Sequence, residues 1–224
     1  MKKYQYLTII VLVCIVLAGC SRLLKVARQN IAEVRQNIYI GENENVVVSF
    51  MAGKREEEYV INGVCTPLTQ FGVIAVTLQN TNIGYVKSGA YSLTNESKSF
   101  SGTLVLNPFD NTYVADIGTI IDNDSPINLD ITIGSFTTSV TLNKINSQWK
   151  IDHNKALEIS TKALKPQLKG WAKKGFDGEV YIKIIHDSKI SSTDYFWYVC
   201  FVNTSGTSHS VIIDPMTSEI LAKK

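Results

Sequence analysis

Short runs of alternating apolar and polar residues fill the middle of the chain and predict β-strands. Residues 127–133 read Ile-Asn-Leu-Asp-Ile-Thr-Ile, so every second side chain is apolar. Such alternation is typical of strands that bury one face and expose the other. Further runs of this kind predict strands at residues 45–50, 73–79, 90–94, 99–106, 112–116 and 136–143.

The dipeptide Asn62-Gly63 lies between two more strand-like runs, residues 58–61 and 64–66, and predicts a two-residue hairpin. The charged run at residues 54–58 predicts a solvated loop or face. Seven to nine short strands without a convincing helix predict an antiparallel β-sandwich of immunoglobulin-like type over residues 38–149. The Cys-Trp-Cys pattern of antibody domains is absent, so this prediction concerns the architecture alone.

An apolar stripe at helical spacing precedes the strands. Leu23, Ala27, Ile31, Val34 and Ile38 recur every three or four residues, which predicts one face of a helix within residues 20–37. The basic residues of this segment lie mostly off the stripe. The segment is therefore interpreted as a helical tether, and three arrangements stay open: a basic helix on an anionic membrane surface, a helix docked on its own domain, or a flexible spacer.

The C-terminal residues 150–224 combine one helix with several strands. Asp152 or Asn154 can cap a helix, apolar residues then recur at helical spacing as far as Leu164, and Pro166 ends or kinks that helix. Strand-like runs follow at residues 179–186, 195–203, 207–214 and 219–222. The expected fold is therefore α+β and mostly β, with the sandwich followed by a small domain in which a helix covers an antiparallel sheet.

The run at residues 195–202 is apolar or aromatic on both faces, so both faces need cover. The single predicted helix can cover one of them. The other face is left to the β domain, a partner protein or a second copy of the chain.

The first residues form a different pattern. Lys2 and Lys3 give a positive start, residues 7–18 are apolar apart from Thr8, and small Gly19 follows. A dozen helical residues span about 18 Å, which is short of the ~30 Å hydrocarbon core of a bilayer. The pattern therefore predicts a cleaved secretory signal peptide over residues 1–19.

The four residues Leu17-Ala18-Gly19-Cys20 resemble the lipobox of bacterial lipoproteins. The resemblance implies that Cys20 becomes the first residue and carries a diacylglycerol on its thiol. Two acyl chains give stable membrane anchoring where one does not. The expected location is the bacterial cell membrane, with the folded part outside the cytoplasm. An ordinary signal peptide with an accidental cysteine, or an uncleaved anchor, is the alternative.

Net charge narrows the expected partners. The chain has 22 basic and 20 acidic side chains, and removal of residues 1–19 takes away Lys2 and Lys3, which leaves 20 of each. A neutral chain argues against nucleic acid as the main partner. The membrane, through Cys20, and a protein or peptide are the expected partners.

Two cysteines remain once Cys14 and Cys20 are set aside. Outside the cytoplasm Cys65 and Cys200 can pair, and closing a loop of about 135 residues is worth roughly 4–5 kcal/mol. Two buried free thiols are the other interpretation.

Residues 156–160, 197–201 and 212–221 together resemble a PepSY domain. Domains of that family commonly end in a strand, an Asp-Pro turn that contains Thr-Gly-Glu, and a last apolar strand. Here Asp214-Pro215 begins the turn, and Ser218 stands where the family usually has a left-handed glycine, at a cost of about 1 kcal/mol. The resemblance implies an extracytoplasmic module that binds or regulates peptides or peptidases, and it transfers no catalytic residue.

Catalytic and metal-binding patterns are absent from the sequence. The three histidines lack metal-ligand spacing, and no nucleophile elbow, phosphate loop or dinucleotide motif occurs, so no cofactor is expected. The run at residues 122–124 does not begin an EF-hand loop, because Ile127 and Ile133 stand where glycine and glutamate are required.

One aromatic and basic cluster near the end of the predicted helix is a candidate binding patch. It comprises Trp171, Phe176, Lys173 and Lys174. Such a cluster suits a glycan, a peptide or lipid headgroups, and packing at the helix end is the alternative.

Together these patterns predict a membrane-anchored extracytoplasmic lipoprotein. Its expected role is that of a non-enzymatic binding or regulatory module for a peptide, a peptidase or another envelope protein. The alternative is an envelope hydrolase with a site between the two domains.

Overall fold

The computed structural model describes residues 22–57, 60, 62, 64–79, 84–96, 98–173, 176, 178–186, 189–191 and 194–224. Residues 17–20 and Lys174 lie outside this part of the chain, as does the side chain of Lys173. The chain divides into two compact units. Unit 1 comprises Met1–Val34, Glu56–Leu68 and Lys150–Lys224, and unit 2 comprises Arg35–Arg55 and Thr69–Trp149.

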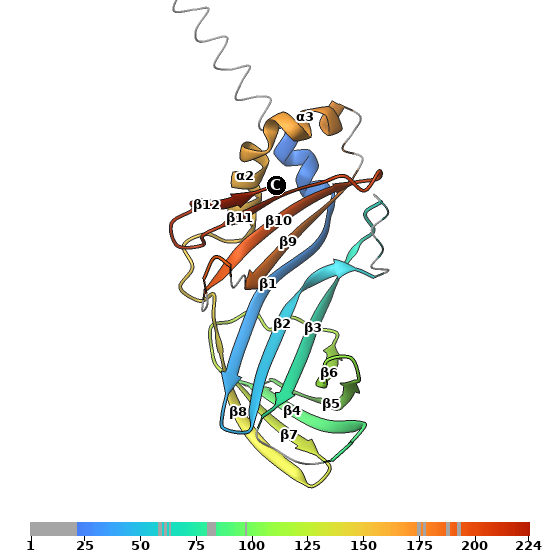
Figure 1. Ribbon diagram of the computed structural model, residues 1–224, viewed down its shortest axis with the longest axis vertical. Coiled ribbons are helices and arrows are strands. Elements are labelled where there is room, and N and C mark those ends of the chain that lie inside the picture. Colours follow the sequence, from blue (N-terminus) through green and yellow to red (C-terminus); the bar gives the residue numbers. More distant parts are fainter. Residues whose placement is uncertain are drawn as a thin grey trace, which may run out of the picture. The chain divides into compact units, whose positions relative to one another are not determined.

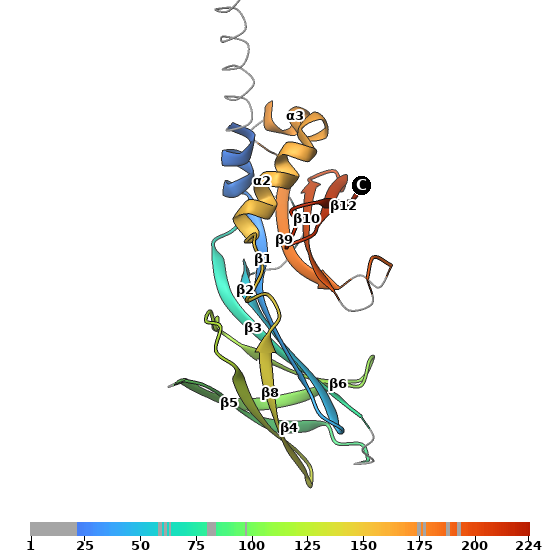
Figure 2. The ribbon, with the colours of Figure 1, turned by 90° about the vertical axis from the view of Figure 1, so that its left-hand side faces the viewer.

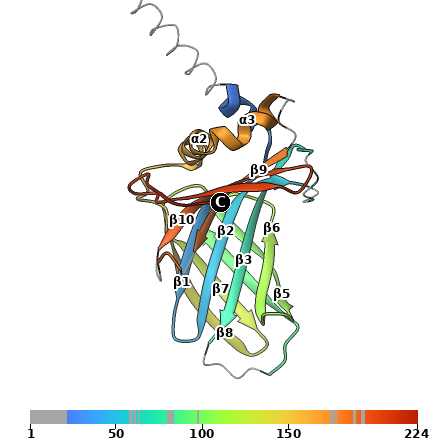
Figure 3. The ribbon, with the colours of Figure 1, turned by 45° about the horizontal axis from the view of Figure 1, so that its top comes forward.

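The described residues of unit 2 form eight strands, three of which extend at one end into unit 1. They are β1 (Ile31–Glu42), β2 (Val46–Glu56), β3 (Leu68–Leu78), β4 (Ser88–Asn95), β5 (Lys98–Asn107), β6 (Thr112–Ile117), β7 (Ile127–Ile133) and β8 (Phe136–Lys144). Neighbours follow the order β1-β2-β3-β6-β5-β4-β7-β8, and β8 pairs again with β1, where Ile40 lies opposite Asn143. The strands therefore close into an antiparallel barrel, which Figures 1 and 3 show from two sides.

The predicted immunoglobulin-like sandwich is wrong. Most of the expected strands exist, and β7 occupies the predicted residues 127–133. Alternation shows which side chains are buried, but it does not show which strands pair. The described residues of the expected hairpin around Asn62, namely 60, 62 and 64–67, lie outside any strand. The strand that closes the barrel, β1, begins inside the segment predicted to be helical.

Within the described residues, the helix predicted over residues 20–37 is present only at residues 22–29. β1 begins at Ile31, and most of its buried residues form two groups, at 32–34 and 37–39. The first part of β1 pairs with β9 and the last part with β8, so both parts are buried without a simple alternation. A strand with this pattern imitates the three- and four-residue spacing of a helix.

Apolar side chains fill the interior of the barrel. The rings of Tyr39 and Phe50 lie 5.8 Å apart, centre to centre. Other large, fully buried side chains of this core are Ile74, Leu93, Leu104, Ile127, Leu129, Ile131, Ile133 and Leu142. The loop at residues 121–126 is bonded to the barrel, since the Tyr39 hydroxyl donates to the Asn123 carbonyl at 2.7 Å and Asn95 Nδ2 donates to Asn123 Oδ1 at 3.2 Å.

Unit 1 contains α2 (His153–Ala163) and α3 (Lys165–Lys173). Asp152 caps α2 as predicted, because its carboxylate accepts a hydrogen bond of 2.8 Å from the Lys155 amide. The predicted break at Pro166 is also confirmed, since a separate helix, α3, starts one residue before the proline.

Unit 1 also contains β9 (Gly178–His186), β10 (Tyr195–Asn203), β11 (Ser208–Ile213) and β12 (Ile220–Lys223), paired antiparallel in that order. On its other side β9 pairs in parallel with the first residues of β1, where Val34 lies opposite Ile182. The start of β1 and the segment between β2 and β3 thus belong to unit 1. The prediction of a helix-on-sheet domain that simply follows a sandwich is therefore wrong, because strand pairing joins the first strand of the chain to the C-terminal sheet.

Residues 22–29, α2 and α3 lie on one face of the sheet β9–β12, as Figure 2 shows, and are called the helical layer below. Leu23 and Ala27 are buried, as are Leu157 of α2 and Leu168 of α3. Docking on its own domain is therefore the arrangement found for the helix at residues 22–29. None of the helices in the described residues is long and apolar enough to cross a membrane.

On the opposite face of β10, one described residue of the segment between β2 and β3 supplies partial cover. Cys65 of this segment packs into one cluster with Tyr181 of β9 and with Cys200 and Val202 of β10. On the other face, the Trp197 indole donates a hydrogen bond of 3.0 Å to a carbonyl just before α2. Residues of unit 1 thus pack on both faces of this strand, and on the face of Tyr198 and Val202 the cover is partial.

Candidate functional site

Three glutamates of unit 1 are almost completely buried, and they are called the acidic cluster below. Glu33 of β1, Glu56 at the end of β2 and Glu179 of β9 are 1%, 2% and 0% exposed. A buried carboxylate is costly unless it is paired or hydrogen-bonded, and buried ionisable groups often mark functional sites. The contacts of these three groups therefore decide what the site can do.

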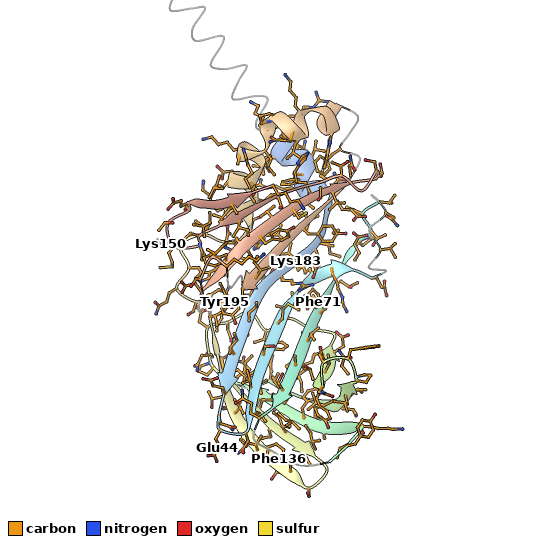
Figure 4. All side chains as sticks on the ribbon, in the orientation of Figure 1. Glu44, Phe71, Phe136, Lys150, Lys183 and Tyr195 are labelled. Carbon is orange, nitrogen blue, oxygen red and sulfur yellow. The ribbon has the colours of Figure 1, made fainter. Side chains whose placement is uncertain are left out.

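Glu33 is paired with Lys183, whose ammonium lies 2.7 Å from the carboxylate. The same ammonium lies 4.9 Å from the centre of the Tyr181 ring. Glu179, Tyr181 and Lys183 alternate along β9 and therefore share one face of the sheet, the face away from the helical layer (Lys183 is labelled in Figure 4). Lys183 is thus held between a buried carboxylate and an aromatic ring.

The other two carboxylates hold the segment between β2 and β3. Glu179 Oε1 accepts a hydrogen bond of 2.9 Å from the Asn62 amide, and its Oε2 accepts one from the Tyr181 hydroxyl. Glu56 Oε2 accepts from the Thr66 amide at 3.0 Å and from the Thr66 hydroxyl at 3.3 Å. Asn62 and Thr66 lie outside strands, so their backbone amides have no partner in a β-sheet. The carboxylates of Glu179 and Glu56 accept hydrogen bonds from these amides instead. The acidic cluster therefore fixes an irregular segment against the sheet.

The predicted cysteine pair lies beside the acidic cluster. Cys65 and Cys200 pack into the same small cluster, and both are free thiols. The disulfide between them stays a prediction.

Burial raises the pKa of both thiols. Burial and the negative charges of Glu56 and Glu179 raise the pKa of the Cys65 thiol to about 12. Burial also raises the pKa of the Cys200 thiol, although the nearby charge of Lys183 acts in the opposite direction. Because the thiolate is the reactive form, a raised pKa lowers the reactivity of both thiols at neutral pH.

Among the described residues, no three His, Cys, Asp or Glu side chains are arranged to hold a metal ion. At the turn of residues 122–124, the ammonium of Lys144 lies 3.0 Å from Asp124 and 3.8 Å from Asp122. A lysine of β8 therefore balances the negative charge of this turn.

The predicted aromatic and basic patch is only partly exposed. Phe176 is buried, with its ring centre 6.2 Å from that of Phe201 and 6.1 Å from that of Trp171. Trp171 is half-buried, and its ring centre lies 5.5 Å from that of His209. These are the contacts expected of packing at the helix end. The basic members of the patch have no described side chains, so a binding role stays a prediction.

The Asp214-Pro215 turn, on which the PepSY resemblance depends, joins β11 to β12. The Asp214 carboxylate accepts hydrogen bonds from the amides of Met216 at 2.7 Å and Thr217 at 3.1 Å. Ser218 adopts the expected left-handed conformation, with a φ of +67°. The turn is thus locked by one carboxylate and closed by one strained serine.

Replacing Ser218 by glycine is expected to raise the free energy of unfolding by about 1 kcal/mol, because glycine has no Cβ to oppose a positive φ. Urea denaturation of the two proteins measures the difference. The matched control is Ser208→Gly in β11, which should lose about 0.5–1 kcal/mol because glycine weakens a strand. A loss at both positions would contradict the left-handed assignment.

Replacing Asp214 by asparagine is expected to remove part of the acid sensitivity of unit 1. Burial tends to raise the pKa of Asp214, but the amide hydrogen bonds from Met216 and Thr217 outweigh burial and hold it below the ordinary 3.8. The stability that the carboxylate contributes is therefore complete above about pH 4 and is lost as the pH falls through the lowered value. As the pH falls from 7 to 3, the free energy of unfolding of the native chain should approach that of Asp214→Asn. A difference that stays constant with pH would contradict a stabilising role for the ionised carboxylate.

The acidic cluster is the feature that the sequence patterns missed. Glu33 falls in a segment predicted to be helical, and Glu56 falls in a charged run predicted to be solvated, yet both are buried. A weak signal was present at Glu179 and Lys183, which interrupt an otherwise apolar strand and therefore need polar partners inside the protein.

The fold defines a mostly β protein, in which a closed barrel is joined to a sheet covered by helices. No protein-family model, curated protein or solved structure matches the chain. The resemblances to bacterial lipoproteins and to PepSY domains therefore rest on the residues quoted above, and both stay predictions.

Proposed function

We propose that the chain is a lipid-anchored protein of the bacterial cell membrane, facing outside the cytoplasm, whose folded part binds a protein or peptide partner. The anchor is supported by the lipobox-like residues 17–20 and by the positive, then apolar, run that precedes them. The buried carboxylates hold the amides and the ammonium of the chain itself, which favours a structural role for them over the hydrolase alternative.

The binding role rests chiefly on Phe109, which is 96% exposed in the turn between β5 and β6. Two side chains lock this turn: Asn107 Oδ1 accepts from the Phe109 amide at 3.2 Å, and Asp110 Oδ1 accepts from the Thr112 amide at 3.1 Å. Because the backbone is already ordered, little conformational entropy is lost when the ring enters a partner's pocket.

Two further exposed apolar side chains lie in the same part of unit 2. Val105 of β5 pairs with Ser88 at the start of β4, and Tyr85 lies three residues before that serine. The Leu106 amide also donates to the Lys87 carbonyl at 2.9 Å, which holds the two segments together. A contiguous patch of exposed apolar groups marks a protein interaction site, whereas single exposed apolar residues are normal, so Val105 and Tyr85 add to the role proposed for Phe109.

A photocrosslinking amino acid at position 109, in living cells, tests the binding role. The expected result is a discrete adduct with an envelope protein or peptide that is absent when the same amino acid replaces the exposed Thr137 of β8. Equal adducts from both positions, or none from position 109, would count against a partner at this surface.

The anchor is tested by Cys20→Ala. The native chain should begin at Cys20, carry the mass of a diacylglycerol and sediment with membranes, and the variant should lose all three properties. A variant that stays membrane-bound with an unchanged mass would refute the anchor.

A further inference from the structure

The helical layer carries a strong excess of positive charge. Its basic residues are Arg22, Lys25, Arg28, Lys155, Lys162, Lys165, Lys169 and Lys173, and its one acidic residue is Glu158. The chain from residue 20 onward has 20 basic and 20 acidic side chains, so everything outside the helical layer holds 12 basic and 19 acidic residues. Residues 20–224 have no net charge, but their helical layer has an excess of positive charge and the remainder an excess of negative charge.

Most of these basic groups are available to a partner. Arg22, Lys25, Arg28, Lys162 and Lys169 are exposed, and none of them forms an ion pair within the described part of the chain. Lys155, by contrast, is paired within the layer, since its ammonium lies 3.0 Å from the carboxylate of Glu158.

The buried residues of the layer fix the direction in which this charge points. Leu23 and Ala27 lie in the core of unit 1, so the exposed basic side chains of residues 22–29 project from the opposite side of the helix. All three helices cover the same face of the sheet, and their outer surfaces therefore point away from it (Figure 2). The charge lies on the outside of the unit.

The layer also begins next to the proposed anchor. Arg22 follows Cys20 by two residues, which span at most roughly 7 Å of extended chain. Charges interact over about 10 Å at 0.1 M salt, so the first basic residues lie within reach of the headgroups around a lipidated Cys20. A short connection of this kind leaves no spacer between the membrane and the basic surface.

We propose that the helical layer binds anionic lipid headgroups and holds unit 1 against the membrane surface. The proposal rests on the proposed lipid anchor, which sets the partner: a membrane is the anionic surface that Cys20 would bring to this layer. Each basic residue near an anionic leaflet increases affinity by about fivefold, so several of them provide the second signal that reinforces an acyl anchor.

Vesicle binding without the acyl chains tests the surface separately from the anchor. The protein used is the chain from residue 20 with Cys20→Ser, which keeps every described residue. It should co-sediment with vesicles of phosphatidylcholine containing one third phosphatidylglycerol and should not bind pure phosphatidylcholine. Binding should disappear as salt rises from about 0.1 M to about 1 M, because the screening length falls from about 10 Å to about 3 Å.

A pair of charge-reversal variants locates the binding surface. The triple variant Arg28→Glu, Lys162→Glu and Lys169→Glu should lose at least about 100-fold in affinity for anionic vesicles. The matched variant Lys54→Glu, Lys87→Glu and Lys98→Glu has the same net charge, changes only exposed residues of unit 2 and should bind within about threefold of the parent. Circular dichroism and urea midpoints confirm that both variants fold.

Three results would overturn the proposal: equal losses in the two variants, equal binding to neutral and anionic vesicles, or binding to polyphosphate without binding to vesicles. Failure of the anchor is recognised separately, because it shows in the mass and membrane fraction of Cys20→Ala in cells. Vesicle binding by the chain without acyl groups supports the basic surface whichever way that experiment ends.

Discussion

Replacing Lys183 by methionine is expected to lower the free energy of unfolding by about 3–5 kcal/mol. The ammonium of Lys183 lies 2.7 Å from the Glu33 carboxylate, which is only 1% exposed. The substitution removes this ammonium and leaves the buried carboxylate without its charge partner. Methionine keeps most of the length and apolar volume of the lysine, so the loss reports the charge. Guanidinium denaturation followed by tryptophan fluorescence, to which the buried Trp197 of the same unit contributes, measures the loss.

Two controls separate burial from the mere presence of an ion pair. Lys155→Met removes a pair with Glu158 of 3.0 Å in which both side chains are 49% exposed, and it should cost less than about 1 kcal/mol. The double variant Glu33→Gln with Lys183→Met removes both charges and should recover most of the loss. Equal losses for Lys183→Met and Lys155→Met would contradict the desolvated environment of the acidic cluster.

Local patterns in the sequence correctly predicted those helices and strands whose surroundings stay the same along their length. β7 alternates perfectly because one face is buried throughout, and α2 begins where Asp152 can accept from the first-turn amide of Lys155. Such features depend on neighbours within a few residues, and a single sequence contains them.

Strands and buried charges whose partners are far away in the sequence could not be predicted from local patterns. β1 changes partner along its length, from β9 at Val34 to β8 at Ile40, so its burial follows neither a strand period nor a single helix face. Burial of Glu33 depends on Lys183, which is far along the chain but lies beside it in the fold. Sandwich and barrel use similar alternating strands, and the choice between them depends on whether β8 meets β1.

Replacing Gly41 by alanine tests that closure directly and is expected to destabilise unit 2 by about 3 kcal/mol or more. A Cβ at this position would collide with the Thr141 carbonyl oxygen of β8 and would lie 2.8 Å from side-chain atoms of Val140 and Leu142. One of the clashing atoms belongs to the backbone, which cannot move away by a change of rotamer. Relieving the clash therefore requires β1 and β8 to separate. Urea denaturation measures the loss, and faster hydrogen exchange confined to the β1 and β8 amides would locate it at the closing pair.

Whether Gly41→Ala lowers or raises the stability of unit 2 distinguishes a closed barrel from an open arrangement. If β1 had a free edge at Gly41, alanine there would stabilise the strand by about 0.5–1 kcal/mol, because glycine loses more backbone freedom on folding. Gly118→Ala is the matched control, since nothing lies within 4 Å of a Cβ built at that residue. A destabilised Gly41→Ala beside an unaffected Gly118→Ala therefore requires the contact between β1 and β8, and a stabilised Gly41→Ala excludes it.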